Sequence, residues 1–220
     1  DWDGIAKAVE KYQPKLTVLC NPNNPTGELA PLSEIERIVS LSKNPVLVDE
    51  AYMEFAQAES AISLIKKYPN VMVIRTLSKA FGLAGMRCGY MVADSDMIDA
   101  VSKVKSPYNL NIFTQAFGAI ALKHRDEIFK VRDGIIAERD RFLAELSFVN
   151  GIRVYPSSTN FFLMDTGTYA PALFEALRKA DILVKKYKSP EIASFFRITV
   201  TTKDVDERIL SVIREVIPNA

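Results

Sequence analysis

Histidine and cysteine are scarce in this chain, whose 220 residues include one histidine, His124, and two cysteines, Cys20 and Cys88. Metal centres built from nitrogen and sulfur ligands need more such side chains, so we expect no metal site. Both cysteines stand in apolar, strand-like runs, which favours buried reduced thiols over a disulfide or a metal pair. His124 lies in the helical run A-L-K-H-R-D-E-I-F and is expected at the surface or its boundary.

An excess of charge of either sign is also lacking, because 28 Lys and Arg stand against 27 Asp and Glu, a formal net charge of +1. A basic surface for nucleic acid is therefore not expected. No apolar run approaches the roughly 18 to 20 residues of a membrane-spanning helix. The first residues, D-W-D-G-I-A-K-A-V-E, lack the basic and apolar regions of a signal peptide. We expect a cytoplasmic protein that binds neither nucleic acid nor membrane.

Short β-branched runs alternate with longer amphipathic ones in the first half of the chain. Strands are expected at L-T-V-L-C (16–20), P-V-L-V-D-E (45–50), V-M-V-I-R-T (71–76) and C-G-Y-M-V-A (88–93). Helices are expected between them, one near residues 62–67 and one that begins with a capping box of Ser33 and Glu36. This alternation predicts an α/β fold with a mainly parallel sheet.

The second half has a different pattern and predicts further parts of the fold. Residues 113–147 are helical in pattern and read as a long connecting helix, with a break expected near Asp133 and Gly134. Residues 148–220 mix short strands and helices, as in a small α+β domain. We therefore expect three parts: part of a large domain over 1–112, the connecting helix over 113–147 and a C-terminal domain over 148–220.

The stretch T-L-S-K-A-F-G-L-A-G-M-R-C-G-Y, residues 76–90, directly follows the third expected strand. Open α/β sheets bind ligands at the carboxyl ends of their strands, and a lysine there can form a Schiff base with an aldehyde. Around Lys79, the hydroxyls of Thr76 and Ser78 and the guanidinium of Arg87 could bind a phosphate. This stretch alone also fits a solvated lysine and a surface arginine.

Two further stretches place polar side chains at strand ends. In V-L-V-D-E-A-Y, Asp49 follows a strand, and a carboxylate there can pair with a pyridinium nitrogen. In N-P-N-N-P-T-G, residues 21–27, prolines and Gly27 make a rigid turn that presents Asn24. Taken singly, each stretch also fits an ordinary loop or turn.

The motifs N-P-N-N-P-T-G, V-D-E-A-Y and S-K-A-F-G-L-A-G-M-R-C-G, in this order, resemble those of the fold-type I pyridoxal-phosphate (PLP) aminotransferases of class I/II. The resemblance runs along essentially the whole chain but begins partway into the family, so an N-terminal part of the large domain is expected to be absent. It implies the aspartate aminotransferase-like fold, PLP as the cofactor, an amino donor and a 2-oxo acid as substrates, and a homodimer.

The resemblance also implies a role for each matching residue. Lys79 would form the Schiff base with the cofactor and, once displaced, act as the general base. Asp49 would hold the pyridine nitrogen. Asn24 and Tyr52 would hydrogen-bond the phenolic oxygen of the ring. The cofactor phosphate would be bound by Thr76, Ser78 and Arg87.

Within this group the chain is most similar to the histidinol-phosphate aminotransferases, through S-P-Y-N-L-N-I-F-T-Q-A, S-S-T-N-F-F-L-M and F-R-I-T-V. This similarity implies transamination of histidinol phosphate with 2-oxoglutarate in histidine biosynthesis, with Arg197 on the substrate's anionic group and Asn160 nearby. The chain departs from that family at Lys185, usually an arginine, and at Thr201, usually a glycine. A lysine offers a point charge without the bidentate fork of arginine.

Several other functions share these motifs. Threonine-phosphate decarboxylases and aromatic aminotransferases have most of them. A regulatory module that binds PLP without turnover, or an inactive fragment, would also carry them. Without the family's N-terminal strands the sheet would expose unpaired edges, so we expect these 220 residues to be stable only with another chain or within a longer protein.

Overall fold

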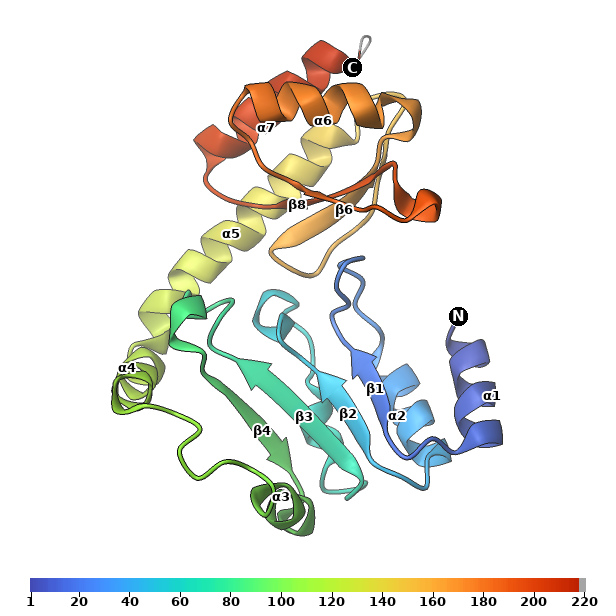
Figure 1. Cartoon of the computed structure of the whole chain (residues 1–220), viewed down its shortest axis with the longest axis vertical. Helices are drawn as coiled ribbons and strands as arrows, with labels where there is room; N and C mark the ends of the chain where they lie inside the picture. The colour runs from blue at the N-terminus through green and yellow to red at the C-terminus, as the bar shows by residue number, and fades with distance from the viewer. Residues whose placement is uncertain (218–220) are drawn as a thin grey trace. The chain divides into compact units, whose positions relative to one another are not determined.

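The computed structural model describes residues 1–217, which divide into two compact units. The first unit comprises Asp1–Pro22 and Leu29–Lys130, and the second comprises Asn23–Glu28 and the chain from Val131 onward. The short segment Asn23–Glu28, coloured blue in Figure 1, thus belongs with the yellow-to-red second unit. We describe each unit by itself.

The first unit is built on a four-stranded sheet in the order β1-β2-β3-β4 (Figure 1). Its strands are β1 (Thr17–Cys20), β2 (Val46–Asp49), β3 (Val71–Thr76) and β4 (Gly89–Ala93). The first three are parallel, as expected, whereas β4 runs antiparallel to β3 with Gly89 opposite Thr76. The carboxyl ends of β1, β2 and β3 and the start of β4 therefore lie at the same end of the sheet. The predicted site residues of this unit stand at this end or in the loops that follow it.

Helices α1 (Trp2–Tyr12) and α2 (Leu32–Leu41) pack on one face of this sheet. They bury an apolar core of β-branched strand residues and helix residues that includes Val9, Ile35, Ile38, Val46, Val48, Val71 and Val73. The unit also contains α3 (Ser95–Ser102) and α4 (Ile112–Lys123), and the expected helix near residues 62–67 is a 3-10 turn over Ala61–Leu64.

The capping box expected at Ser33 and Glu36 is wrong. Helix α2 begins at Leu32, so Pro31 occupies the N-cap, two residues before the expected Ser33, and no side chain caps the helix. The fixed φ of proline suits a helix start and leaves no amide there to satisfy. Glu36 instead accepts hydrogen bonds from Lys67 and Tyr68, at 2.7 and 3.1 Å.

The helical region expected over residues 113–147 is two helices, α4 and α5 (Arg125–Leu146), which meet at His124. The break expected near Gly134 is wrong, because α5 continues through that residue. A glycine costs a helix only about 1 kcal/mol, and the buried side chains of Ile136 and Phe142 that follow it anchor the helix in the core.

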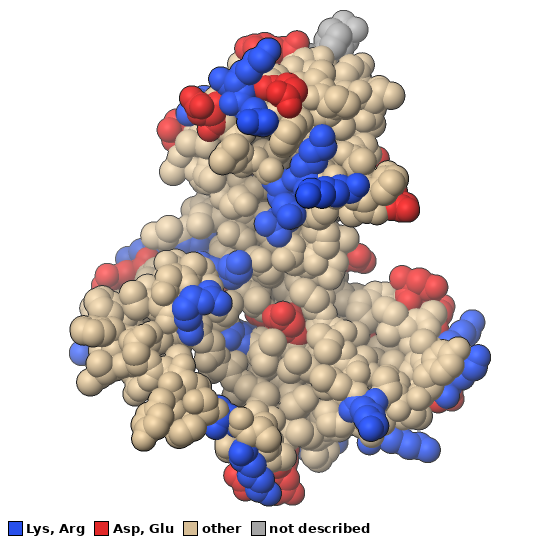
Figure 2. Space-filling view, in the orientation of Figure 1, with Lys and Arg blue, Asp and Glu red and all other residues tan. Residues whose placement is uncertain are grey.

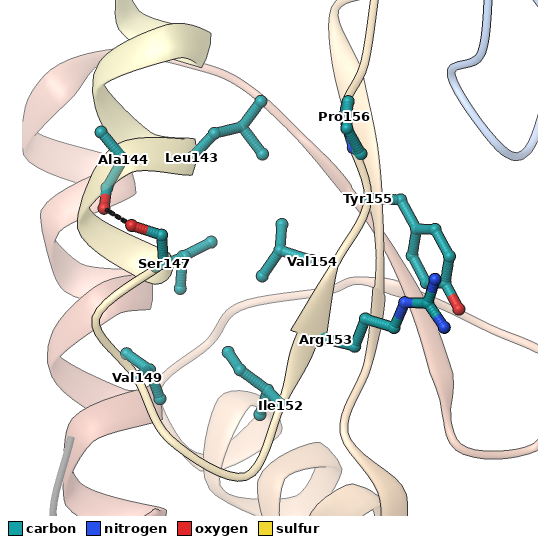
Figure 3. A pocket seen from close by; sticks show the side chains of 10 residues that line it. Leu143, Ala144, Ser147, Val149, Ile152, Arg153, Val154, Tyr155 and Pro156 are labelled. Carbon is teal, nitrogen blue, oxygen red and sulfur yellow. Dashed lines mark hydrogen bonds between the residues drawn. The ribbon is translucent and has the colours of Figure 1, made fainter.

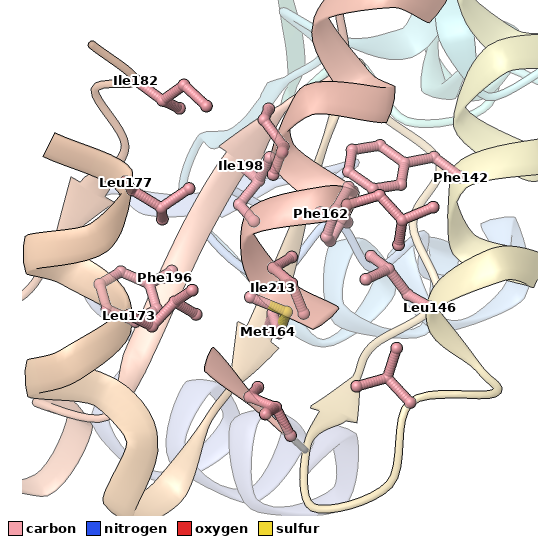
Figure 4. Packing of buried hydrophobic residues seen from close by; sticks show 14 of the residues in the cluster. Phe142, Leu146, Phe162, Met164, Leu173, Leu177, Ile182, Phe196, Ile198 and Ile213 are labelled. Atoms are coloured by element: carbon pink, nitrogen blue, oxygen red, sulfur yellow. The ribbon is translucent and has the colours of Figure 1, made fainter. Parts of the chain in front are cut away.

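The second unit contains an antiparallel sheet in the order β5-β6-β8-β7. Its elements after α5 are β5 (Arg153–Val154), β6 (Phe161–Asp165), α6 (Ala170–Lys179), β7 (Lys185–Lys186), β8 (Phe195–Thr199) and α7 (Lys203–Val216). Helices α5, α6 and α7 bury one apolar cluster with this sheet (Figure 4), in which the rings of Phe142 and Phe162 lie edge to face 5.2 Å apart.

Charged side chains of both signs are interspersed on the face seen in Figure 2, in keeping with the small net charge. Over residues 1–217, no helix combines the length and apolar character needed to cross a membrane. The same residues contain no group of three or more His, Cys, Asp or Glu side chains arranged to hold a metal ion. Cys20 and Cys88 form no disulfide within residues 1–217, and both are half-buried, whereas buried thiols were expected.

Candidate active site

Two predicted ring-binding residues, Asp49 and Tyr52, lie at the end of β2 and just after it in the first unit. Asp49 ends the strand, and its Oδ1 accepts a hydrogen bond from the amide of Ala51 at 3.0 Å, which holds the half-buried carboxylate at the sheet edge. Tyr52 is buried, 7% exposed. The Nζ atom of Lys79, from the loop after β3, lies 5.2 Å from the centroid of the Tyr52 ring. The structure thus brings the predicted lysine and tyrosine together.

The predicted phosphate ligands stand on the loop between β3 and β4. Thr76 Oγ1 lies 2.9 Å from Ser78 Oγ and 3.1 Å from the carbonyl oxygen of Cys88, and it accepts the amide of Ser78 at 3.1 Å. The amide of Leu77 also donates to Cys88, at 3.0 Å. These bonds close the loop at its base and hold the two hydroxyls beside each other, next to Lys79 in the sequence.

Arg87 completes this set with an exposed side chain and a strained backbone. Its φ of 53° lies in the left-handed region, which a residue with a Cβ adopts at some cost. Its Nη1 donates to the carbonyl of Ala84 at 3.1 Å. Strain of this kind is common at ligand-binding sites, where surrounding structure holds a side chain in place.

Gly89 allows β4 to start close against β3. A Cβ built on Gly89 would lie 2.8 Å from the carbonyl oxygen of Arg75, so any larger residue would push the strands apart. The loop that carries Lys79 would then move with them.

A buried ion-pair cluster lies beside this loop and was missed by the sequence analysis. Arg75, in β3, donates to Glu50 Oε2 from Nη2 at 2.7 Å and from Nε at 3.0 Å, and to Glu54 Oε1 from Nη1 at 3.3 Å. Burial raises the pKa of Glu54, whose Oε2 has no hydrogen-bond partner among the described residues. The signal available in the sequence was an arginine within the apolar strand V-M-V-I-R-T.

The other predicted site residues belong to the second unit. Arg197, in β8, donates from Nη1 to Asn24 Oδ1 at 2.7 Å. A guanidinium can only donate, so this contact makes Oδ1 the acceptor and leaves the amide nitrogen of Asn24 as a donor. The Nε of Arg197 is buried and has no hydrogen-bond partner among residues 1–217. One arginine therefore orients Asn24 and keeps a further donor.

Lys185 and Asn160 differ in their distance from Arg197 along the strands. Lys185 pairs with Arg197 across β7 and β8, on the same face. Asn160 precedes β6, where Leu163 is the partner of Arg197, so it lies about 10 Å along the strand from that position. Its carbonyl accepts the amide of Val200 at 2.9 Å. Lys185 is thus the nearer of the two to Arg197 in strand register.

Asn24 is held on a turn that rests on the loop Ser157–Asn160. The amide of Ser158 donates to the carbonyl of Gly27 at 2.8 Å. Gly27 has a φ of 78°, and a Cβ there would lie 2.4 Å from Ser157 Oγ. Only glycine fits this position, which the sequence analysis had explained by the turn alone.

Arg139 of α5 is a second residue that the sequence analysis missed. It is only 8% exposed, and its Nη1 donates to the carbonyl of Thr159 at 3.2 Å. It stands in helical phase with the buried Ile136 and Phe142, so a charged residue in an apolar helix stripe was the available signal.

A cavity of about 520 Å³ opens in the second unit between the end of α5 and β5 (Figure 3). The side chains of Leu143, Val149, Ile152 and Val154 point toward it, whereas Arg153 and Tyr155 lie on the other side of the strand. It contains none of the predicted site residues. Its lining continues the apolar core of the unit.

Comparison with known proteins identifies the family. A family model described as aminotransferase class I and II matches residues 1–213. The chain belongs to this family. The histidinol-phosphate aminotransferase of Thermoanaerobacter pseudethanolicus is 42% identical to the chain over an alignment of 220 positions, which covers 99% of the chain and 61% of that protein. The chain thus spans about three fifths of the length of this curated relative.

Solved structures support the same fold. The histidinol-phosphate aminotransferase from Clostridium acetobutylicum matches with a TM-score of 0.91 at 26% identity, over 100% of this chain and 68% of that one. The enzyme from Sinorhizobium meliloti, solved in complex with pyridoxal-5'-phosphate, matches with a TM-score of 0.88 at 28% identity, over 99% of this chain and 61% of that one. The predicted α/β aminotransferase fold is confirmed.

Proposed function

We propose that this protein is a PLP-dependent aminotransferase that converts histidinol phosphate and 2-oxoglutarate to imidazole acetol phosphate and glutamate, a step of histidine biosynthesis. The observation that carries the proposal is the loop between β3 and β4. It presents Lys79 against Tyr52 together with the hydroxyls of Thr76 and Ser78. The name of the 42% identical relative supports the choice of substrate.

The residues present fit PLP. The first unit offers a carboxylate at the end of β2, a lysine amine beside an aromatic ring, and hydroxyl and guanidinium donors on one loop. Added Cβ atoms at Gly82 and Gly85 of that loop would meet no atom within 4 Å, so the loop has open space beside it. A cofactor with an aldehyde, a pyridine nitrogen and a phosphate needs this combination of groups.

Each group then has a defined task. When bound, PLP supplies an aldehyde that condenses with amines and a ring that takes up electrons. Lys79 would hold the cofactor through its ε-amine and, as a free amine, would move a proton at the substrate's α-carbon. Asp49 would keep a proton on the ring nitrogen. The phosphate would be held by Thr76, Ser78 and Arg87.

Residues of the second unit would bind the phenolic oxygen of the cofactor ring and the anionic group of the substrate. Arg197 would bind the anionic group of the amino donor or of 2-oxoglutarate, for which its unpartnered Nε is a ready donor. Asn24, held by Arg197 with its amide nitrogen left as a donor, would hydrogen-bond the phenolic oxygen together with Tyr52. Asn160 would lie close to the substrate. We further propose a homodimer located in the cytoplasm.

The direct test is a steady-state assay of the full-length protein with histidinol phosphate, phosphothreonine and aromatic amino acids as alternative substrates. We expect turnover of histidinol phosphate with 2-oxoglutarate, and none detectable in Lys79→Ala. Preferred turnover of phosphothreonine or of an aromatic amino acid would overturn the substrate assignment. Bound PLP without turnover of any of these would identify a binding module instead.

A further inference from the structure

Arg139 is an unusual residue for the inner face of α5. Its side chain is only 9% exposed, and it forms an ion pair with its neighbour Asp140 at 2.9 Å. The side chain of Asp140 is 61% exposed, so this ion pair is open to solvent and contributes little to stability. The guanidinium also reaches the neighbouring loop, because its Nη1 donates a hydrogen bond to the carbonyl of Thr159 at 3.2 Å.

The carbonyl that Arg139 holds belongs to a loop closed by hydroxyl groups. Thr159 is fully buried, and its Oγ1 lies 3.0 Å from Ser157 Oγ and 2.8 Å from the carbonyl of Phe161. The amide of Thr159 also donates to Ser157 Oγ at 3.1 Å. These bonds make residues 157–161 a single folded element, so a bond to one carbonyl fixes the whole loop.

The turn Asn23–Glu28 rests on this loop. The amide of Ser158 donates to the carbonyl of Gly27, and the missing Cβ of Gly27 leaves room for Ser157. Within the turn, the amide of Gly27 donates to the carbonyl of Asn23 at 2.7 Å. This turn places the side chain of Asn24 within hydrogen-bond distance of Arg197.

We propose that Arg139 is a positioning residue: by holding the carbonyl of Thr159 it fixes the Ser157–Asn160 loop, and through that loop it sets the position of Asn24. The support for Asn24 then comes from two sides, Arg197 at its side chain and Arg139 through the loop beneath its turn. Only the last step, that Asn24 serves the ring oxygen of PLP, rests on the proposed function.

The first test does not depend on the cofactor. Amide hydrogen exchange of peptides that cover residues 23–28 and 157–160 is compared in the full-length protein and in Arg139→Met, Arg139→Lys and Arg141→Met. Arg141 is a matched control, because it also lies on α5 and pairs with Glu138 and Glu207, but within residues 1–217 it makes no hydrogen bond to the loop. Circular dichroism shows whether each variant is folded.

We expect both peptides to exchange about tenfold faster in Arg139→Met, the effect of losing one charge-assisted hydrogen bond. Arg139→Lys should restore part of the protection, and Arg141→Met should leave these peptides unchanged. Unchanged protection of residues 23–28 in a folded Arg139→Met protein would overturn the proposal. If Arg139→Met does not fold, Arg139→Lys decides: faster exchange in these two peptides supports the proposal, and wild-type exchange contradicts it.

The second test reads the position of Asn24 in the loaded protein. The visible absorbance of bound PLP is titrated with pH, and the midpoint is compared with that of Asn24→Ala. We expect Arg139→Met to move the midpoint in the direction that Asn24→Ala does, and Arg141→Met to leave it in place. An unmoved midpoint in Arg139→Met would contradict the proposal. A wild-type protein that never acquires the visible band would instead refute the proposed function, while the exchange experiment still decides the role of Arg139.

Discussion

At the scale of single residues, the contact between Arg197 and Asn24 links two predicted roles. The two residues are 173 positions apart, yet their side chains meet at 2.7 Å. Because the arginine orients the amide of Asn24, loss of either residue should weaken both the proposed binding of the cofactor's phenolic oxygen and the proposed binding of the substrate's anionic group.

We expect Arg197→Ala to lower the affinity for both substrates by about 100-fold, since a desolvated charged contact is worth roughly 2 to 3 kcal/mol. Asn24→Ala should weaken PLP binding, and the double variant should lose less than the sum of the two single effects. A double-mutant cycle on the dissociation constant of PLP measures this coupling. Strict additivity would show that the contact carries no such linkage.

Two neighbouring glutamates are expected to respond in opposite ways to substitution. Glu50 is fully buried and accepts hydrogen bonds from Ser60, the amide of Ala61 and Arg75. Glu50→Ala leaves Arg75 without its main partner, so we expect a loss of about 3 to 5 kcal/mol in the free energy of unfolding. Urea denaturation of the full-length protein measures it, and a loss below about 1 kcal/mol would contradict the assignment.

Substitution of Glu54 is expected to increase the free energy of unfolding, because burial raises the pKa of this carboxyl in the folded protein. The folded state then binds the proton more tightly than the unfolded state, so stability falls as pH rises through the raised pKa. Glu54→Gln removes this penalty. It should therefore stabilise the protein at about pH 8, with a gain that shrinks towards about pH 4.5. A constant difference from wild type across this range would refute the explanation.

At the scale of elements, the ends of the strands and the parallel direction of the first three strands were the most predictable features. Asp49 was expected at a strand end from four preceding apolar residues, and the parallel pairing of β1, β2 and β3 follows from the alternation of strands and helices. The antiparallel β4 has no such signal, because its pairing depends on the path of the loop after Thr76. The start of α2 was misplaced because the proline at the N-cap competes with a serine two residues further along the chain.

The candidate site was predictable from sequence only as a set of roles. The motifs that carry Lys79, Asp49 and Arg87 are local, so their residues could be named from the resemblance. The supports of Asn24 are not local, because Arg139 and the Ser157–Asn160 loop act on a turn more than a hundred residues away. Such contacts depend on the packing of α5 and β6, which no short motif encodes.

The turn Asn23–Glu28 gives the prediction at this scale. In Gly27→Ala, the alanine would have to adopt a positive φ and its Cβ would displace Ser157. We therefore expect the turn to shift and the affinity for PLP to fall by about tenfold. A fluorescence titration with PLP measures the affinity. Gly134→Ala is the control, because a Cβ there meets no atom within 4 Å. Equal affinity in the Gly27 and Gly134 variants would contradict the role of the turn.

At the scale of the whole molecule, the chain leaves apolar surface exposed in its first unit. Helix α4 exposes a set of large apolar side chains, Ile112, Phe113, Phe117, Ile120 and Leu122, and the edge strand β1 exposes Val18. Both edges of the four-stranded sheet, β1 and β4, are unpaired within the described residues. Contiguous apolar surface and open edges favour association.

We therefore expect these 220 residues, produced alone, to self-associate or to bind a hydrophobic dye such as ANS. Light scattering coupled to size exclusion reports the first property and dye fluorescence the second. A monodisperse, folded monomer that binds no dye would show that this surface is tolerated in water.

The central claim is that the ε-amine of Lys79 holds the cofactor, and covalent trapping tests it most directly. The full-length protein is incubated with PLP, reduced with borohydride, digested and analysed by mass spectrometry. The account predicts a yellow protein that yields a reduced pyridoxyl adduct on the peptide containing Lys79, and no such adduct in Lys79→Ala. A colourless protein, or an adduct confined to other lysines, would contradict it.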